Sequence, residues 1–163
     1  VSIGSIKKAI KSFKGLPHRL EKVCTRKGVE YYNDSFSSIP ETSIAAIRSF
    51  GRKPIHLIGG GSEKFSDFKN WAKACIEQKN LKTILLTGEQ SASRMAIELE
   101  KAIKKHKRNL KVIHVDTLAD AINEIKTLAK SGSVALLSPA CASFEEFPNY
   151  KVRGKTFKTL ARK

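Results

Sequence analysis

The segment Val134-Ala-Leu-Leu-Ser-Pro-Ala-Cys-Ala-Ser143 joins an apolar run to a proline and four small residues. Residues 134–137 have the composition of a buried β-strand, and Pro139 ends it because proline has no backbone N–H to donate. The segment Phe144-Glu-Glu-Phe147 that follows can begin a helix, with Ser143 as its N-cap. Ligands bind at the carboxyl ends of strands in open α/β sheets. The segment is therefore typical of either a strand-to-helix connection or a ligand-binding loop.

Short β-rich runs alternate along the chain with stretches that carry apolar residues at helical spacing. The runs lie at residues 30–32, 55–58, 83–86, 112–115 and 134–137. Apolar stripes lie between them at 44–50, 65–75, 95–103 and 118–129, with Ser91 and Thr117 as candidate N-caps. The alternation predicts a Rossmann-like three-layer α/β domain, a mostly parallel sheet of about six strands with helices on both faces.

The head of the chain is predicted to be a separate amphipathic helix. Its apolar positions are Ile3, Ile6, Ala9, Ile10 and Phe13, and Gly15 ends it. We expect residues 1–14 to be the end of a preceding domain or a linker helix, and residues 15–163 to be the α/β domain.

Size and composition indicate one globular domain. The chain has 163 residues, of which 40% are hydrophobic and 28% charged, enough to bury a substantial core. No apolar run approaches the roughly 20 residues of a membrane span, and the first residues lack a secretory-signal pattern. Cys24, Cys75 and Cys141 form no CxxC pair, so neither a disulfide framework nor a zinc site is indicated. Free thiols suit a reducing cytosol, and we expect a cytoplasmic protein.

The net charge of +16, from 31 Lys and Arg against 15 Asp and Glu, is extreme. Such a charge attracts anions and also occurs in nucleic-acid-binding proteins. The basic residues are spread over predicted polar helix faces. We therefore favour solvated helix faces, followed by an anionic small-molecule partner, over nucleic acid.

Polar and glycine-rich loops follow the predicted strands, and right-handed crossovers would place these loops along one edge of the sheet. Gly59-Gly-Gly61 fits neither GxxxxGK[ST] nor GxGxxG, so its glycines indicate close backbone approach or a bare turn, while Lys64 offers a cation. Asp34 could accept hydrogen bonds from a ribose or belong to an Asx turn. The gathered loops predict a binding site.

The loops contain no complete catalytic apparatus. The four histidines lack metal-ligand spacing, and no GxSxG elbow or carboxylate pair occurs. Cys141 is favoured as a packing residue over a nucleophile. We expect no catalytic residue and no metal ligand in this chain, which would carry half of an active site.

Motifs along the chain resemble the C-terminal domain of the muramyl ligases, in particular members that add D-glutamate. The match covers the chain from about Phe13. The motifs are Gly15-Leu-Pro-His-Arg-Leu-Glu21, Gly28-Val-Glu-Tyr-Tyr-Asn-Asp-Ser35, Ile58-Gly-Gly-Gly-Ser-Glu-Lys-Phe-Ser-Asp-Phe68, Leu137-Ser-Pro-Ala-Cys-Ala-Ser-Phe-Glu-Glu-Phe147, and Tyr150 with Arg153-Gly154.

The resemblance implies the last domain of a three-domain, ATP-dependent amide ligase of peptidoglycan synthesis in the bacterial cytoplasm. In such enzymes ATP phosphorylates the carboxylate of UDP-N-acetylmuramoyl-L-alanine, and the amine of D-glutamate attacks the acyl phosphate. The preceding domains would hold the UDP-sugar, the Walker lysine and most Mg²⁺ ligands, while this domain delivers the amino acid and closes over ATP. The resemblance thus implies ATP and D-glutamate as ligands, Mg²⁺ as a cofactor, a monomer, and no activity in this fragment alone.

The resemblance also implies roles for residues at matching motif positions. Arg19 would contact the nucleotide and Asp34 its ribose. The residues implied for the amino acid are Ser38, Lys64, Ser143, Phe144 and Tyr150. Lys64 would meet a carboxylate of the amino acid, where a charge-assisted hydrogen bond is strong.

The chain departs from the family at Asn33-Asp-Ser-Phe-Ser-Ser-Ile39, where muramyl ligases usually read Asn-Asp-Ser-Lys-Ala-Thr-Asn. Ser38 keeps the hydroxyl of the threonine that it replaces. Phe36 replaces a lysine, which removes a cation and an anion contact of about 1–3 kcal/mol. A ligase for a different amino acid therefore stays an alternative, as does a basic module that binds nucleic acid.

Overall fold

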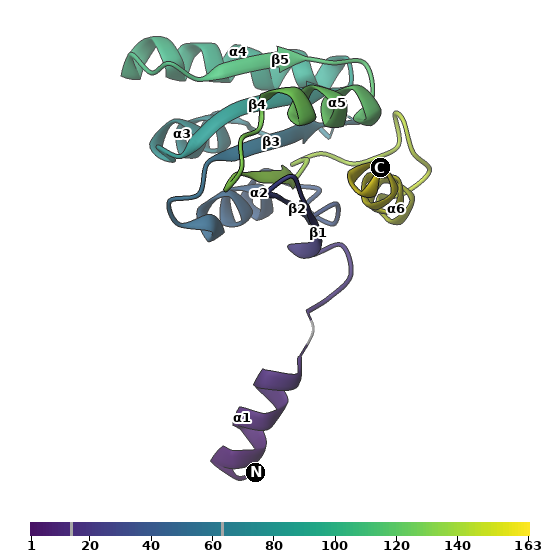
Figure 1. Cartoon of the computed structure of the whole chain (residues 1–163). Coiled ribbons are helices and arrows are strands. Elements are labelled where there is room, and N and C mark those ends of the chain that lie inside the picture. The colour runs from purple at the N-terminus through teal and green to yellow at the C-terminus, as the bar shows by residue number, and fades with distance from the viewer. Residues whose placement is uncertain (14, 63) are drawn as a thin grey trace.

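The computed structural model describes residues 1–13, 15–62 and 64–163. Strands and helices alternate through most of it, as Figure 1 shows. The strands are β1 (Glu21–Arg26), β2 (Val29–Asn33), β3 (Ile55–Gly60), β4 (Leu81–Thr87), β5 (Lys111–His114) and β6 (Val134–Leu137). The helices are α1 (Ile3–Ser12), α2 (Pro40–Ile47), the 3-10 turn η1 (Arg48–Phe50), α3 (Lys69–Glu77), α4 (Gln90–His106), α5 (Leu118–Leu128) and α6 (Tyr150–Arg162).

One six-stranded sheet has the order β1-β2-β6-β3-β4-β5, and all neighbours pair in parallel except β1 with β2. This confirms the predicted three-layer α/β fold. Strand β1 was not among the predicted runs. It pairs with β2 through the two-residue turn Lys27-Gly28, in which both residues have positive φ (48° and 76°). Turns of this kind match the right-handed twist of a hairpin.

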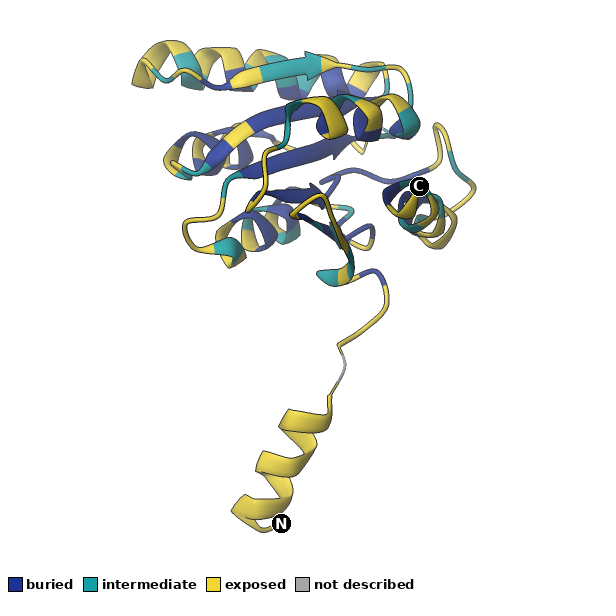
Figure 2. Cartoon of the chain, viewed as in Figure 1, coloured by how far each residue is buried: buried dark blue, intermediate teal, exposed yellow. Residues whose placement is uncertain are grey.

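Alternate residues of the central strands face two helical layers. On β6, Val134 and Leu136 pack with α2, α3 and α4, whereas Ala135 and Leu137 pack with α5 and α6. Trp71 on α3 is fully buried in the first layer. In Figure 2 the central strands are largely buried and the outer faces of the helices exposed. A strand buried on both faces accounts for the unbroken apolar run that the sequence shows there.

The predicted helix starts were partly wrong. Thr117 is the N-cap of α5 and forms a capping box with Asp120, as expected. Ser91 is not an N-cap, because α4 begins at Gln90 and the Ser91 hydroxyl bonds Gly61 of another loop. Residues 144–147 form turns instead of a helix. Phe147 precedes Pro148, a position that disfavours helical backbone, and the last helix begins only at Tyr150.

Helix α1 stands apart from the sheet and its helices (Figure 1) and buries none of its residues. It ends at Ser12 with Phe13 as its C-cap, so it stops before Gly15; Lys14 lies outside the described residues. The helical part of the prediction is confirmed, and the assignment of residues 1–14 to a linker or a preceding domain stays a prediction. Among the described residues, no helix is both long and apolar enough to cross a membrane.

Candidate functional site

The loops after β2, β3, β4 and β6 meet at the carboxyl edge of the sheet, as predicted. Ala140 N donates to Ser37 O (2.9 Å) on one side of the 138–143 loop. On the other side, Gly60 N donates to Pro139 O (2.8 Å) and Ser62 N donates to Ala142 O (3.0 Å). The loop after β6 is therefore held by backbone hydrogen bonds to the loops of both neighbouring strands.

The glycines at the end of β3 allow these backbones to approach closely. Gly60 has φ 99°, and a Cβ there would lie 2.1 Å from Thr87 O. Gly61 has φ 132°, and a Cβ there would lie 2.3 Å from Ala142 O. Close backbone approach, one of the two predicted roles, therefore explains the glycine run.

Asp34 is an internal anchor as well as the predicted ribose ligand. Its side chain is buried, with Oδ1 accepting from Leu20 N (3.1 Å) and Oδ2 from Ser138 Oγ (2.8 Å). Burial raises the pKa of this carboxyl group, while the hydrogen bonds from Ser138 and Leu20 oppose that rise. The carboxylate thus ties the chain before β1 to the loop after β6, and its contact with a ribose stays a prediction.

His18 and Asn33 form the base of the same region. Asn33 Nδ2 donates to His18 Nδ1 (3.0 Å) and to Glu21 Oε2 (3.1 Å), while Asn33 Oδ1 accepts from Ser35 N (3.1 Å). This assignment makes Nδ1 of His18 an acceptor. Burial also lowers the pKa of His18, which favours the neutral ring. Gly154 leaves space for that ring, since a Cβ there would lie 2.2 Å from His18 Nδ1.

Phe36 lies between Arg19, which is predicted to contact the nucleotide, and Tyr150, which is predicted to contact the amino acid. The Arg19 guanidinium lies 5.6 Å from the Phe36 ring centroid, and the Tyr150 ring meets Phe36 edge-on at 4.9 Å. These side chains line a cavity of about 460 Å³ together with His18, and Leu16, Pro17 and Lys151 complete its wall. Arg19 and Tyr150, predicted for the nucleotide and the amino acid, therefore belong to one pocket whose shared wall is aromatic.

The other predicted amino-acid ligands lie along the same edge. Ser38 is half-buried, and its N–H donates to Phe36 O (2.9 Å). Lys64 is exposed, beyond the bridge that joins Ser62 to Ala142. Ser143 is buried, and Phe144 after it is 72% exposed. The structure gathers the loops that carry these residues, and their contacts with an amino acid stay predictions.

Arg153 is a buried residue whose structural role sequence reasoning missed. Its guanidinium donates to Ser35 O (3.0 Å), Ser35 Oγ (3.1 Å), Ala142 O (2.9 Å) and Cys141 O (3.1 Å). Burial lowers its pKa to about 10. The signal was its spacing, because Arg153 precedes the buried Phe157 by one helical turn on the inner face of α6. Arg153 thereby fastens α6 to two loops of the site.

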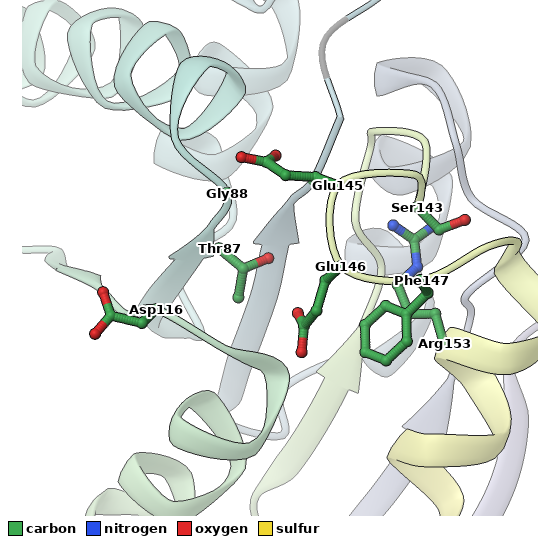
Figure 3. A pocket seen from close by; sticks show the side chains of 9 residues that line it. Thr87, Gly88, Asp116, Ser143, Glu145, Glu146, Phe147 and Arg153 are labelled. Atoms are coloured by element: carbon green, nitrogen blue, oxygen red, sulfur yellow. The ribbon is translucent and has the colours of Figure 1, made fainter.

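A second cavity of about 170 Å³ lies between the end of β4 and residues 143–147 (Figure 3). The side chains that face it include Thr87, Asp116, Glu145 and Glu146. Nearby, Cys141 is buried with its sulfur 3.9 Å from Met95 Sδ, so it packs as predicted. Within residues 1–13, 15–62 and 64–163, no three His, Cys, Asp or Glu side chains gather as a metal site would require.

Comparison with known protein families identifies the family of this domain. The family model described as "Mur ligase, glutamate ligase domain" matches residues 18–141, more than half of the chain. The chain belongs to the Mur ligase family. The match begins at His18, which lines the pocket beside Phe36, and ends at Cys141 in the loop after β6.

Relatives of this Mur ligase domain carry a more specific name. It is 36% identical over 160 residues to a UDP-N-acetylmuramoylalanine–D-glutamate ligase of Clostridium botulinum (strain 657 / Type Ba4), covering 98% of the chain and 34% of the relative. It is 39% identical over 158 residues to the ligase of that name from Koribacter versatilis (strain Ellin345), covering 97% of the chain and 32% of the relative. The chain thus spans about a third of the length of the curated relatives that it matches.

Solved structures share the fold of this Mur ligase domain. A MurF ligase from Thermotoga maritima in complex with ADP has a TM-score of 0.62 at 18% identity, over 93% of the chain and 33% of that protein. A bifunctional folylpolyglutamate synthase/dihydrofolate synthase from Yersinia pestis has a TM-score of 0.66 at 11% identity, over 98% of the chain and 34% of that protein. At these identities the likeness concerns the fold.

Proposed function

We propose that this Mur ligase domain is the C-terminal part of a cytoplasmic bacterial ligase that joins D-glutamate to UDP-N-acetylmuramoyl-L-alanine at the expense of ATP, in peptidoglycan synthesis. The named relatives support this reaction, because their identity extends over almost the whole chain. The observation that carries the proposal is the pocket in which Arg19 and Tyr150 meet on Phe36. Arg19 is the cationic residue proposed for the nucleotide, and Tyr150 is one of those proposed for the amino acid. A ligase needs such residues in one pocket because it must hold both ligands close together.

The chemistry assigns this domain a positioning role. Transfer of the γ-phosphoryl group to the substrate carboxylate gives an acyl phosphate. The amine of D-glutamate then attacks the acyl carbon, loses a proton and expels inorganic phosphate. Lys64 and Ser143 would bind carboxylates of the amino acid, Ser38, Phe144 and Tyr150 would enclose it, and Arg19 and Asp34 would hold the nucleotide. The Mg²⁺ ligands and the catalytic groups would belong to the two-thirds of the protein that precede this domain.

Exposed apolar side chains support closure of this edge against the rest of the protein. Phe36, Ile39, Phe65 and Phe144 lie in the loops that follow the parallel strands, and each is more than 40% exposed. Large exposed apolar groups at one edge of a domain mark a surface that another part covers. We infer that the domain turns about the linker proposed for residues 1–14 and closes over ATP. This closure would exclude water from the acyl phosphate.

Phe36 favours a second candidate, a ligase of this family for a less acidic amino acid. An exposed phenyl ring, packed edge-on against Tyr150, offers no charge to a second carboxylate. Such a wall suits a side chain with an apolar portion.

The test is turnover by the complete ligase with ATP, UDP-N-acetylmuramoyl-L-alanine and single amino acids. D-Glutamate should give the highest kcat/KM, and Ser143→Ala should raise its KM by about 10- to 100-fold, because a hydrogen bond to a charged group is lost. Preference for an amino acid without a side-chain carboxylate, such as L-lysine, would favour the second candidate, whereas preference for glycine or L-glutamate would contradict both candidates. ATP hydrolysis or ligation by these 163 residues alone would contradict the positioning role.

A further inference from the structure

Glu145 and Glu146 bind the N-termini of two different helices. Glu145 Oε1 accepts from the backbone N–H of Glu89, the N-cap residue of α4 (2.8 Å). The two carboxylate oxygens of Glu146 each lie 3.2 Å from the backbone nitrogen of Leu118, the first residue of α5. In Figure 3 the two side chains diverge from adjacent positions, one toward Gly88 and the other toward the turn before α5.

Both carboxylates occupy places that the helices leave open. Helix α4 has no side-chain cap of its own, so Glu145 supplies an acceptor from another segment. In α5 the capping box satisfies the N–H groups of Thr117 and Asp120, and Glu146 accepts from Leu118, one of the two residues between them. A carboxylate is favourable at a helix N-terminus, where unpaired N–H groups and the helix dipole present positive charge.

These contacts fix one end of the loop at residues 142–146, and other hydrogen bonds fix the opposite end at Ala142. At the first end, Ala142 O accepts from Ser62 N (3.0 Å) and from Arg153 Nη1 (2.9 Å). Between the two ends lie only Ser143 and Phe144, and Phe147 N donates to Ser143 O (2.8 Å) across the turn. Gly88 admits the second end, since a Cβ there would lie 2.5 Å from Glu145 Oε2.

We propose that Glu145 and Glu146 are positioning residues, which hold Ser143 and Phe144 in place for the amino-acid substrate by anchoring their loop to α4 and α5. The proposal rests on the proposed function, because it takes Ser143 and Phe144 as ligands of that substrate. It predicts that the loop is formed before the substrate arrives, so loss of an anchor weakens amino-acid binding and leaves Arg19, the residue proposed for the nucleotide, in place.

The variants that test the anchors are Glu145→Ala and Glu146→Ala, with Glu145→Gln and Glu146→Gln as conservative partners. Glutamine keeps one oxygen that can accept the backbone N–H, while the charge is lost and an NH2 group replaces the second oxygen. Glu100→Ala, an exposed position on α4 away from the loop, is the matched control. Two measurements are made: hydrogen exchange of the loop amides in this 163-residue chain, and steady-state kinetics of the complete ligase.

In the alanine variants, exchange at the Phe147 amide should accelerate by about tenfold or more, because the opening free energy of the loop falls. The KM for D-glutamate should rise by about tenfold, while kcat and the KM for ATP stay within about twofold. The glutamine variants should recover most of both effects, and Glu100→Ala should show neither.

Unchanged exchange at residues 143–147 in both alanine variants would overturn the proposal. Faster exchange with an unchanged amino-acid KM in an active ligase would also overturn it, and would leave the proposed function intact. Failure of the wild-type ligase to turn over D-glutamate would instead overturn the proposed function, and the exchange rates would still decide whether the anchors exist.

Discussion

Arg153 shows how one buried side chain can hold together the loops of a site. Its guanidinium satisfies carbonyl oxygens from two loops that are far apart in the sequence. Its charge faces the oriented dipoles of these peptide groups, and the carboxylate of Glu146 also attracts it. A guanidinium suits this place because its donors lie in one rigid plane and point in several directions.

Arg153→Lys should lower the free energy of unfolding by about 2–4 kcal/mol, since lysine reaches fewer of these oxygens and leaves the rest buried without a donor. Urea denaturation of the two proteins measures the difference. Arg162→Lys, an exposed position on the same helix, should change it by less than about 0.5 kcal/mol. Equal effects at both positions would show that the hydrogen bonds of Arg153 contribute little.

His56 on β3 gives the domain a dependence on pH. The ring is buried, its Nδ1 finds no hydrogen-bond partner among the described residues, and burial lowers its pKa. The folded state therefore disfavours the protonated ring. The contribution of neutral His56 to the free energy of unfolding is fully present above the unfolded-state pKa of about 6.5. It falls as the pH drops below that value, by at most about 1.4 kcal/mol per pH unit for one proton.

His56→Leu should flatten this loss, because leucine fills a similar volume and does not titrate. The measurement is the urea midpoint between about pH 7.5 and pH 5.5, where histidine changes charge. His106→Leu, at an exposed position near the end of α4, should retain the wild-type slope. A His56→Leu protein with the wild-type slope would assign the acid sensitivity to another group, of which His18 is the first to test because burial also lowers its pKa.

Among the elements, α5 depends most clearly on its first turn. Thr117 Oγ1 accepts from Asp120 N (3.1 Å), and Asp120 Oδ2 accepts from Thr117 N (3.1 Å). Thr117→Ala should therefore lower the free energy of unfolding by about 1 kcal/mol in chemical denaturation. Thr127→Ala in the same helix removes only an exposed bond to Asn123 O and should cost less than half as much. The reverse order would show that the capping box is not the source of the stability.

Periodicity predicted the elements that are buried and failed at those set by distant contacts. The parallel strands and the helices between them have apolar patterns that arise from burial on one or two faces. Strand β1 is a half-exposed edge strand with a mixed polar sequence, so it has no such pattern. Residues 144–147 carry helix-forming side chains, yet Glu145 and Glu146 bind other helices, and those partners cannot be recognised from local sequence.

The position of the site could be predicted from the sequence, but its side-chain contacts could not. Its position follows from the topology, because parallel strands place their carboxyl ends at one edge. The contact of Phe36 with both Arg19 and Tyr150 depends on how α6 packs on β1 and β2, which no local pattern specifies.

At the scale of the whole molecule, α1 is independent of the folded domain. It has no buried residue, and its apolar side chains Ile3, Ile6, Ile10 and Phe13 are exposed. A chain that begins at Gly15 should therefore unfold within about 0.5 kcal/mol of the full chain in urea, because no core contact is lost. A larger loss would show that α1 packs on the domain in solution and would contradict the linker predicted for residues 1–14.

The place of β6 in the sheet matters while the protein is being made. Strand β6 lies between β2 and β3, pairing Val134 with both Glu30 and Ile55. A chain growing from its N-terminus can form the β1–β2 hairpin and the β3–β4–β5 portion first, but each keeps a bare edge until β6 leaves the ribosome. Unpaired edges invite association with other chains. Translation that pauses before Val134 would thus expose two partial sheets with unpaired edges, and the segment that leads into the loop with Ser143 is also the one that joins them.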